Sequence, residues 1–320
     1  MSTPTLLTYG PGNIDETLTL TMTNLIPGIK DNIFRENTVI GWLFDNAKKK
    51  VKGGASLSHG IRYAKSTAGG SYARYEQLDV TPQDNLTRDQ WPWKQYYHTV
   101  AIDGFTERTN MGQFAIDDAL EEKKEQAEMS LKEDLEIDLF AASPAANDLR
   151  SLPVVVLASG TEGQINGSTS TWWQSQVSTA GSWAAGVGRS ALVTLCNTIA
   201  KRNPTGMPEI LVSDQDDVER YESTLVSQYR YTNNKPDIGA AAKLMFKEIP
   251  WIWSVQATSN VIYALHSKGI DLTVHTNCDF IMTPFVKPAN QDARVGQILF
   301  MAALTSGNRR KLGKTASNAA

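Results

Sequence analysis

The residues best spaced for chemistry are two histidines and a cysteine near the C-terminus. His266, His275 and Cys278 lie close together in the sequence, and His275-x-x-Cys278 could ligate zinc. A structural zinc site uses four ligands in recognisable pairs, and here the second pair is incomplete. Unrelated loop residues are therefore the favoured interpretation. A metal-dependent hydrolase built on this region is the alternative from the enzyme class.

Two other motifs resemble ligand sites only superficially. The glycine-rich run 186–190 lacks the GxxxxGK[ST] spacing and the lysine of a phosphate-binding loop, so it predicts the start of a helix. Asp214, Asp216 and Asp217 could bind a cation, but acidic residues at a helix start also offset the positive end of the helix dipole. His59 and His98 have no evident carboxylate or nucleophile partner. We therefore expect no enzyme, no cofactor and no metal site.

An aromatic and basic run at Tyr72, Arg74 and Tyr75 is the best candidate for a binding surface. Nucleic-acid bases can stack on such a surface, but Tyr and Arg are also enriched at protein–protein interfaces. The chain has 31 Lys+Arg and 34 Asp+Glu, whereas dedicated nucleic-acid binders usually carry a strong basic excess. A protein–protein face is therefore the favoured interpretation.

The composition predicts a folded protein with one large domain or two medium ones. The chain has 320 residues, 41% of them hydrophobic, and only two cysteines, Cys196 and Cys278, which we expect to be reduced. The first twenty residues do not have the pattern of a signal peptide, and no stretch approaches the ~20 apolar residues of a membrane span. We expect no contact with a membrane.

The aromatic run lies in a segment that is predicted to be extended. Two polar strands, 61–65 and 72–80, are predicted to pair through a turn at Gly69-Gly70, and an aromatic-rich strand follows at 93–102. The first two strands contain little apolar material, and an isolated hairpin is barely stable in water. This hairpin must therefore lie on its own core or on a neighbouring subunit.

The strongest local signal is a long helix over 113–140. Asn110 is a candidate N-cap, no residue breaks the helix before Ser143-Pro144, and the helix would span roughly 40 Å. One face is strongly acidic and is predicted to be solvated. We hypothesise that it lines a DNA-filled cavity and repels the polymer, which charge reversal of Glu121, Glu122 and Glu125 would test. The apolar positions repeat at near-helical spacing: Ile116, Leu120, Ala127, Leu131, Leu135 and Leu139.

The rest of the chain divides into an arm, an α/β region and terminal strands. The arm, about residues 1–50, has a weak strand pattern at 17–23 and a short helix at 34–44. In the α/β region, one helix is expected at 187–201 and a second begins after Ser213 or Asp214. The apolar face of the second helix is expected at Val218, Tyr221, Leu225 and Tyr229. Strands are expected at 209–212 and 243–255, and an exposed loop at 232–237. Strands 262–265 and 272–274 follow, and the apolar run 297–304 fits either a strand or a helix.

This order of parts resembles one protein family, and several residue strings support the likeness. They are Gly-Ser-Tyr at 70–72, Tyr-Glu-Gln-Leu-Asp-Val-Thr-Pro at 75–82, Trp-Lys-Gln-Tyr at 93–96, Glu-Arg-Thr-Asn-Met-Gly at 107–112, Trp-Trp at 172–173, Tyr-Glu at 221–222, Asn-Gln-Asp-Ala at 290–293 and Asn-Arg-Arg-Lys-Leu-Gly at 308–313. The chain is similar to the major capsid proteins of tailed bacteriophages, which share the bacteriophage-capsid (Johnson) fold. One departure is Asn147-Asp148-Leu149, where the family often has a Gly-Leu pair.

The resemblance implies an α+β fold with a role for each part. It implies an N-terminal arm (1–52), an extended loop in the form of a long β-hairpin (53–104), a peripheral domain with a spine helix (105–145 and 266–320) and an axial domain (146–265). The implied inter-subunit contacts are Arg62, Tyr63, Lys65, Tyr72, Arg74, Tyr75, Asn233 and Asn234. Some relatives crosslink a lysine of this loop to an asparagine, and Lys65 has a matching place. The crosslinking chemistry is not carried over, because no residue identifies the asparagine or the activating acid.

The implied function is a structural one. Pentamers and hexamers would close into an icosahedral shell around double-stranded DNA, assembled in the host cytoplasm as a rounder precursor and present in the virion. A separate scaffolding protein and a portal are expected partners, with a decoration protein as an optional one. The nearest alternative is an encapsulin-like compartment with protein cargo. Another is a structural protein that forms tubes or layers.

Overall fold

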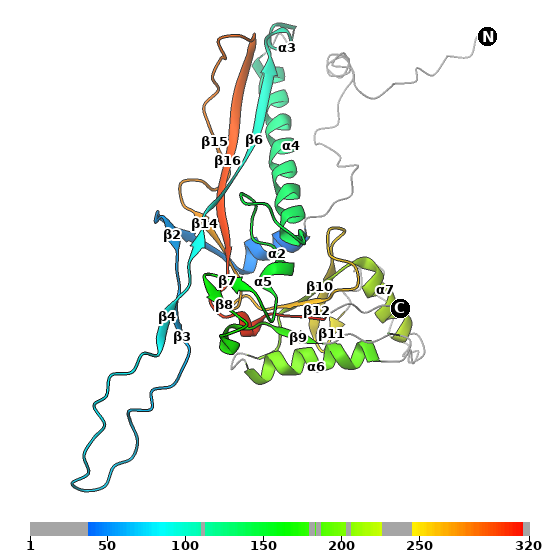
Figure 1. Ribbon diagram of the computed structural model, residues 1–320. Helices are drawn as coiled ribbons and strands as arrows, with labels where there is room; N and C mark the ends of the chain where they lie inside the picture. The colour runs from blue at the N-terminus through cyan, green and yellow to red at the C-terminus, as the bar shows by residue number, and fades with distance from the viewer. Residues whose placement is uncertain are drawn as a thin grey trace. The chain divides into compact units, whose positions relative to one another are not determined.

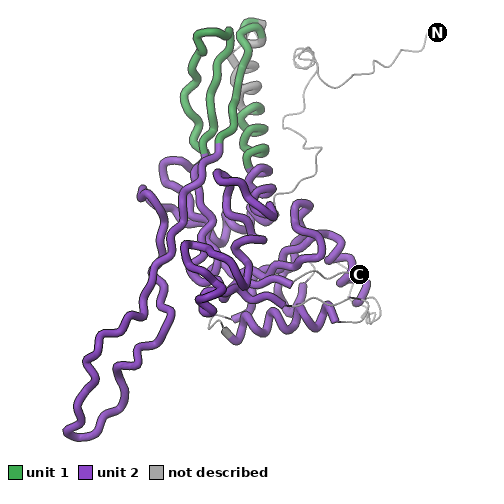
Figure 2. The backbone as a smooth tube through the Cα atoms, viewed as in Figure 1, with its two compact units in different colours: residues 1–34, 97–131, 280–299 green, residues 35–96, 132–279, 300–320 purple. Residues whose placement is uncertain are grey.

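The computed structural model describes residues 38–109, 113–178, 183, 187–202, 206–225 and 245–315. The chain forms two compact units, shown in different colours in Figure 2. Unit 1 comprises residues 1–34, 97–131 and 280–299, and unit 2 comprises residues 35–96, 132–279 and 300–320. No helix within the described ranges is long and apolar enough to cross a membrane.

Unit 1 contains the ends of long strands and the first part of a long helix. β15 (Ile281–Met282) pairs antiparallel with the first half of β16 (Ala293–Thr305), and β6 (Lys94–Asp103) also pairs with β16. The apolar run 297–304, which fits either a strand or a helix, is therefore a strand. The short helix α3 (Gly104–Thr109) follows β6. The aromatic-rich strand predicted at 93–102 is confirmed within one residue at each end.

The long helix α4 spans Gln113–Phe140, with the bounds that the sequence predicts. Ala127, Leu131, Leu135 and Leu139 are buried, and their spacing of four places them on one face. The acidic face is not solvated throughout, because Glu136 is only 2% exposed and Asp138 accepts a hydrogen bond from the Tyr96 hydroxyl at 2.6 Å. Contacts with other parts of unit 2, at Ser254 for Glu136 and at Tyr96 for Asp138, explain this difference, and the helical pattern does not show them. Asn110 and the side chains of 110–121 lie outside the described residues.

Unit 2 is built on a mixed six-stranded sheet and its helices. The strand order is β11 (Met245–Phe246), β12 (Ile249–Trp253), β10 (Ile210–Ser213), β13 (Tyr263–Leu265), β17 (Gly313–Thr315) and β9 (Gln176–Ser178). The helices are α6 (Val187–Arg202) and α7 (Gln215–Leu225), both at their predicted places (Figure 1). Leu192, Leu195 and Ile199 of α6 pack with Leu211 and Trp251 of the sheet in one hydrophobic core.

A second group of elements in unit 2 holds the end of the arm. The helix α2 (Thr38–Asn46) leads into β1 (Lys48–Val51), which runs parallel to β14 (Asp271–His275). β14 pairs antiparallel with the second half of β16. All three lysines of β1 have ion-pair partners: Lys48 and Lys50 share Asp279, and Lys49 pairs with Asp271.

Short elements connect these sheets and form the root of the extended segment. They are β2 (Ser56–Leu57), β3 (Gly60–Arg62), β4 (Leu86–Arg88), β5 (Trp91–Pro92), α5 (Leu152–Val155), β7 (Thr161–Glu162), β8 (Ile165–Asn166), η1 (Thr171–Trp173) and η3 (Arg309–Lys311). β2 pairs with β5 and β3 pairs with β4, both antiparallel.

The predicted hairpin of strands 61–65 and 72–80 is wrong in its register. The chain pairs Gly60–Arg62 with Leu86–Arg88, and residues 63–85 contain no strand. The backbone of this stretch instead bonds to its own side chains, because Glu76 accepts from the Ala73 N–H and Asp79 accepts from the Thr81 N–H. These local bonds compete with a strand ladder.

Two other expectations need correction or lie outside the structure. The single strand expected at 243–255 is a hairpin of β11 and β12, because Lys247 and Glu248 both have positive φ angles and turn the chain. The strand expected at 17–23, the loop at 232–237 and Tyr229 lie outside the described residues, as does part of the helix expected at 34–44.

Candidate assembly surface

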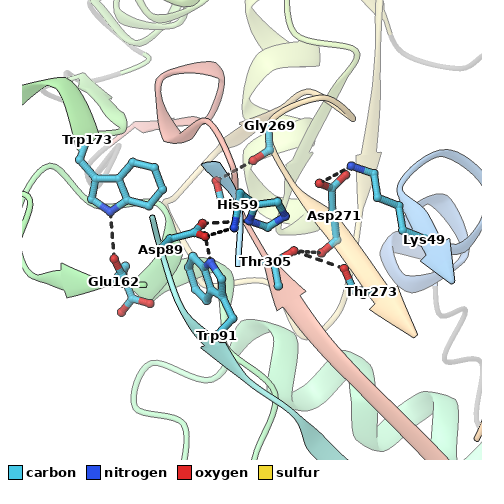
Figure 3. A network of polar contacts seen from close by, with 11 residues as sticks. Lys49, His59, Asp89, Trp91, Glu162, Trp173, Gly269, Asp271, Thr273 and Thr305 are labelled. Atoms are coloured by element: carbon cyan, nitrogen blue, oxygen red, sulfur yellow. Dashed lines mark hydrogen bonds and ion pairs between the residues drawn. The ribbon is translucent and has the colours of Figure 1, made fainter. Parts of the chain in front are cut away.

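Asp89 joins the two strand pairs at the root of the extended segment. It lies between β4 and β5, opposite His59, which lies between β2 and β3. The carboxylate accepts hydrogen bonds from the His59 backbone N–H and from Trp91 Nε1 at 2.7 Å, and its Oδ2 lies 2.9 Å from His59 Nδ1 (Figure 3). The Asp89 N–H in turn donates to the His59 carbonyl. One carboxylate therefore ties both limbs of the hairpin together.

The Asp89 side chain is fully buried, so its charge is not stabilised by water. Its hydrogen bonds and the imidazole of His59 provide that stabilisation. In turn, the hydrogen bond to Asp89 holds the pKa of the His59 ring above its ordinary value of 6.5, against the opposing effects of burial and of Lys49. The bonded Asp89 carboxylate is the main cause, and Asp271 adds to it. The pair is consequently ionic at pH values where an isolated histidine would already be neutral.

The turn between β7 and β8 packs directly against Asp89. Gly163 has a φ of +59°, and a Cβ at this position would lie 2.9 Å from Asp89 Cβ. Its carbonyl accepts from the Gln90 N–H at 3.0 Å. Only glycine combines this left-handed backbone with so close an approach. The β7–β8 turn therefore holds Asp89 in place at the root.

An aromatic cluster completes the root. Trp91, Trp173, Leu57 and Ile61 are buried together with Ala303 of β16. Trp173 Nε1 donates to the Glu162 carbonyl at 2.9 Å, as Figure 3 shows. This packing anchors the first residues of each limb in the core of the chain's own unit 2.

Buried Arg309 supports the same cluster from the C-terminal end of the chain. Its Nε and Nη2 donate to the carbonyls of Val155 and Leu157 at 3.0 and 2.9 Å, and its guanidinium lies 5.8 Å from the centre of the Trp173 ring. Burial lowers the pKa of Arg309 to about 10, which still leaves it charged at neutral pH. Glu162, which pairs with Arg150 at 2.8 Å, opposes this lowering.

Beyond the root the extended segment, residues 63–85, is highly exposed. Tyr75 is 91% exposed, Val80 90% and Tyr72 70%, and Leu78 is also exposed. Monomeric proteins rarely expose so many large apolar side chains close together. Within the described part of the chain, nothing covers them.

Six of the eight predicted contact residues lie on this segment or at its base. Tyr63 stacks on Trp172 at 5.3 Å between ring centres, and its hydroxyl donates to the Asp84 carbonyl. Arg74 lies 5.3 Å over the Tyr75 ring, while Arg62 and Lys65 are exposed. Among the described residues none of the three basic side chains has an ion-pair partner. The other two, Asn233 and Asn234, lie outside the described residues.

The candidate metal residues are not brought together as a ligand set. His266 Nδ1 lies 3.2 Å from Glu209 Oε1. His275 packs edge-on against the Trp93 ring, and Cys278 is a free thiol. Asp216 and Asp217 do lie in the first turn of α7, but Asp217 is fully buried and burial raises its pKa to about 6. Within the described ranges no group of three His, Cys, Asp or Glu residues could hold a metal ion.

Sequence reasoning missed the Asp89 root. His59 was expected to have no carboxylate partner, which is wrong, because its partner lies thirty residues away across a hairpin whose register was misplaced. One signal in the sequence could have indicated this site. Asp89 stands two residues before Trp91, and an acidic residue so close to a large aromatic residue needs a polar partner if both are buried.

Comparison with known proteins agrees with this architecture at the level of the fold. No protein-family model and no curated protein matches the sequence. Among solved structures, the capsid asymmetric unit of cyanophage A-1(L) superposes with a TM-score of 0.62 at 14% identity, over 92% of this chain and 96% of that chain. The chain has the bacteriophage-capsid fold.

Other structures with the capsid fold give the same result. The capsid of a native GTA particle has a TM-score of 0.62 at 9% identity and covers 93% of this chain and 94% of its own. The holo-SrpI encapsulin complex from Synechococcus elongatus PCC 7942 has a TM-score of 0.56 at 10% identity and covers 94% of each chain. The capsid fold therefore occurs both in phage shells and in an encapsulin.

Proposed function

We propose that this chain is the major capsid protein of a tailed phage, a structural subunit and not an enzyme. Many copies would assemble as pentamers and hexamers into an icosahedral shell that encloses double-stranded DNA in the virion. The observation that carries the proposal is the extended segment, which has a firmly packed root but exposes Tyr72, Tyr75, Leu78 and Val80. A surface of this kind fits a partner, and repeated copies of one chain supply the same partner at every position.

The parts of the chain receive roles within this proposal. Residues 1–52 would clasp one neighbour, and residues 53–104 would reach across another. Residues 105–145 and 266–320 would form the peripheral domain, and residues 146–265 the axial domain, with Asn233 and Asn234 near the symmetry axes. A separate scaffolding protein, a portal and an optional decoration protein would complete the particle.

Deletion of residues 66–71 tests the proposal directly. The deleted residues lie in the exposed segment and pack against no core in the described part of their own chain. We therefore expect the subunit to fold and shell closure to fail. A variant with Gly and Ser at these six positions keeps the length and controls for it. Electron microscopy of particles and urea unfolding of the subunit are the two measurements. Normal shells from the deletion variant would show that the segment has been assigned wrongly.

An encapsulin-like compartment is the second candidate, because the capsid fold also occurs in the holo-SrpI encapsulin complex. The two candidates differ in what the particle encloses. Particles produced with their neighbouring genes should protect double-stranded DNA from nuclease. Particles that contain a specific protein and no protected DNA would favour the compartment.

A further inference from the structure

The His59–Asp89 pair is placed where it can control the direction of the whole extended segment. Beyond Arg62 and Leu86 the limbs still exchange a few hydrogen bonds, from the Tyr63 N–H to the Asn85 carbonyl at 3.1 Å and from the Thr67 hydroxyl to the Gln83 side chain at 3.0 Å, but residues 63–85 form no strand. The two short strand pairs at the root are therefore the last regular structure before the tip. A small rotation at the root is amplified along the segment. His59 and Asp89 lie between these two strand pairs, at the point where such a rotation would occur.

Each limb contributes one member of the pair, so the contact holds the limbs in a single relative arrangement. The backbone N–H of His59 donates to Asp89 Oδ1, while the His59 ring and Trp91 Nε1 both bond to Asp89 Oδ2. Gly163 prevents Asp89 from moving away, because that turn is already in contact with it. The imidazole is the one member of this contact that is partly open to solvent, with 29% of its side chain exposed.

We infer that the His59–Asp89 pair is a proton-operated clamp that positions the extended segment for its contact with a second copy of the chain. This inference rests on the proposed shell function. With His59 protonated, the ion pair fixes the segment in one direction, which lowers the conformational cost of docking. Loss of the proton leaves a weaker contact and a wider range of directions.

The charged groups around the ring determine the direction of this effect. Asp89 faces His59 from the β4–β5 connection, Asp271 from β14 and Lys49 from β1. Lys49 is itself paired with Asp271 at 2.7 Å, so these two largely offset each other and Asp89 dominates. Because the pKa of His59 is raised, the ionic contact is complete below pH 6.5 and is lost as the pH rises through the higher folded value. Assembly should therefore weaken on the alkaline side.

The test uses light scattering to measure the assembly rate of the full-length wild type and of His59→Gln between about pH 5.5 and about pH 9. The wild-type rate should fall as the pH rises, and the ratio of the acidic to the alkaline rate should be smaller in His59→Gln than in the wild type. His98→Gln removes another half-exposed histidine and should keep the wild-type profile. An unchanged profile in His59→Gln would overturn the inference.

A second measurement locates the proton itself. Imidazole NMR of the histidine-labelled full-length chain, which has four histidines, should show a resonance with a pKa above 6.5 that disappears in His59→Gln and thereby assigns it to His59. Asp89→Asn should move this titration downward. A His59 titration at or below 6.5 would refute the clamp even if Asp89→Asn fails to fold. If the wild type forms no shells at any pH, the shell function fails, while the titration still reports on the pair.

Discussion

At the residue scale, buried polar groups and the residues that accommodate them determine the local geometry of the capsid fold in this chain. Asp89 holds the two limbs of the extended segment, and Glu136 of α4 accepts a hydrogen bond from the Ser254 hydroxyl while facing the backbone N–H groups of Val39 and Ile40 at the start of α2. Burial raises the pKa of Glu136 in spite of these bonds. Carboxylates of this kind are costly to bury and act mainly as specific tethers between elements.

Gly163 provides a test of how tightly Asp89 is held. Gly163→Ala should lower the unfolding free energy by roughly 2–3 kcal/mol, because the new Cβ adds a clash with Asp89 to an unfavourable φ. Gly160→Ala is the matched control, since Gly160 also has a positive φ but open space around its Cβ position. That variant should lose only about 1 kcal/mol in urea unfolding. Equal losses would show that the contact with Asp89 is unimportant.

Asp217 predicts a distinct pH dependence of subunit stability. Burial raises its folded pKa from 3.8 to about 6, although Arg220 lies 3.5 Å away and opposes the shift. The raised value means that Asp217 contributes stability below pH 3.8 and that this contribution is lost as the pH rises to about 6. The loss amounts to roughly 3 kcal/mol at most.

Asp217→Asn removes this titration. The stability of the variant relative to the wild type should therefore increase between about pH 4 and about pH 6.5, as measured by urea unfolding at each pH. Asp216→Asn, at the exposed neighbouring position in the same helical turn, controls for the loss of one negative charge at the start of α7. A constant difference between Asp217→Asn and the wild type would contradict the assignment.

At the element scale, the extended segment is anchored at its root and contributes little to its own chain beyond it. Its root is packed among Trp91, Trp173 and Ile61, whereas its tip contributes almost nothing to the chain's own core. Substitutions at the tip should therefore affect interactions between copies and leave the subunit intact.

A fourfold variant tests this separation. Replacing Tyr72, Tyr75, Leu78 and Val80 by serine should change the unfolding free energy by no more than about 0.5 kcal/mol, because all four side chains are exposed. The same variant should fail to form shells, as judged by sedimentation and electron microscopy. Tyr72→Phe with Tyr75→Phe keeps both rings and should still assemble. A large loss of subunit stability would indicate that the tip packs on its own chain.

At the scale of the whole molecule, the two compact units differ in how much apolar surface they bury. Among the described side chains of unit 1, the buried apolar residues are Val100, Ile102, Ala127, Leu131 and Ile298. Unit 2 contains the large cluster around Trp251 and Tyr221 and the cluster around Trp91 and Trp173. Regions with few buried contacts open more readily than well-packed cores. Unit 1 should therefore depend on neighbouring copies for much of its protection.

Hydrogen exchange measured by mass spectrometry checks this difference. In the free subunit, the backbone amides of β15 and of 293–299 should exchange faster than those of β10, β12 and β13. Assembly into shells should slow exchange in unit 1 more than in the six-stranded sheet of unit 2. Equal protection of both units before assembly would contradict the prediction.

Elements with a strong local signal could be predicted from the sequence. The helix Gln113–Phe140 follows from an unbroken run of helix-forming residues with apolar positions four apart, and the strand near 94–103 follows from its alternating aromatic residues. The resemblance in residue strings also predicted the capsid fold. The exposure of Tyr72 and Tyr75 agrees with the expected surface, while their role in contacts between copies stays a prediction.

What only the tertiary structure decided is the partner of each polar group and the register of each pairing. The segment 72–80 has a strand-like composition but forms no strand, and the Ala73 N–H and the following Thr81 N–H donate to the side chains of Glu76 and Asp79. The run 297–304 became a strand because β14 and β15 pair with it. Asp89 and His59 are distant in sequence, and Glu136 and Ser254 more so. Local periodicity predicts whether a segment forms a helix or a strand. The partner of a buried charge is whichever group the fold brings next to it, and the identity of that group depends on the whole chain.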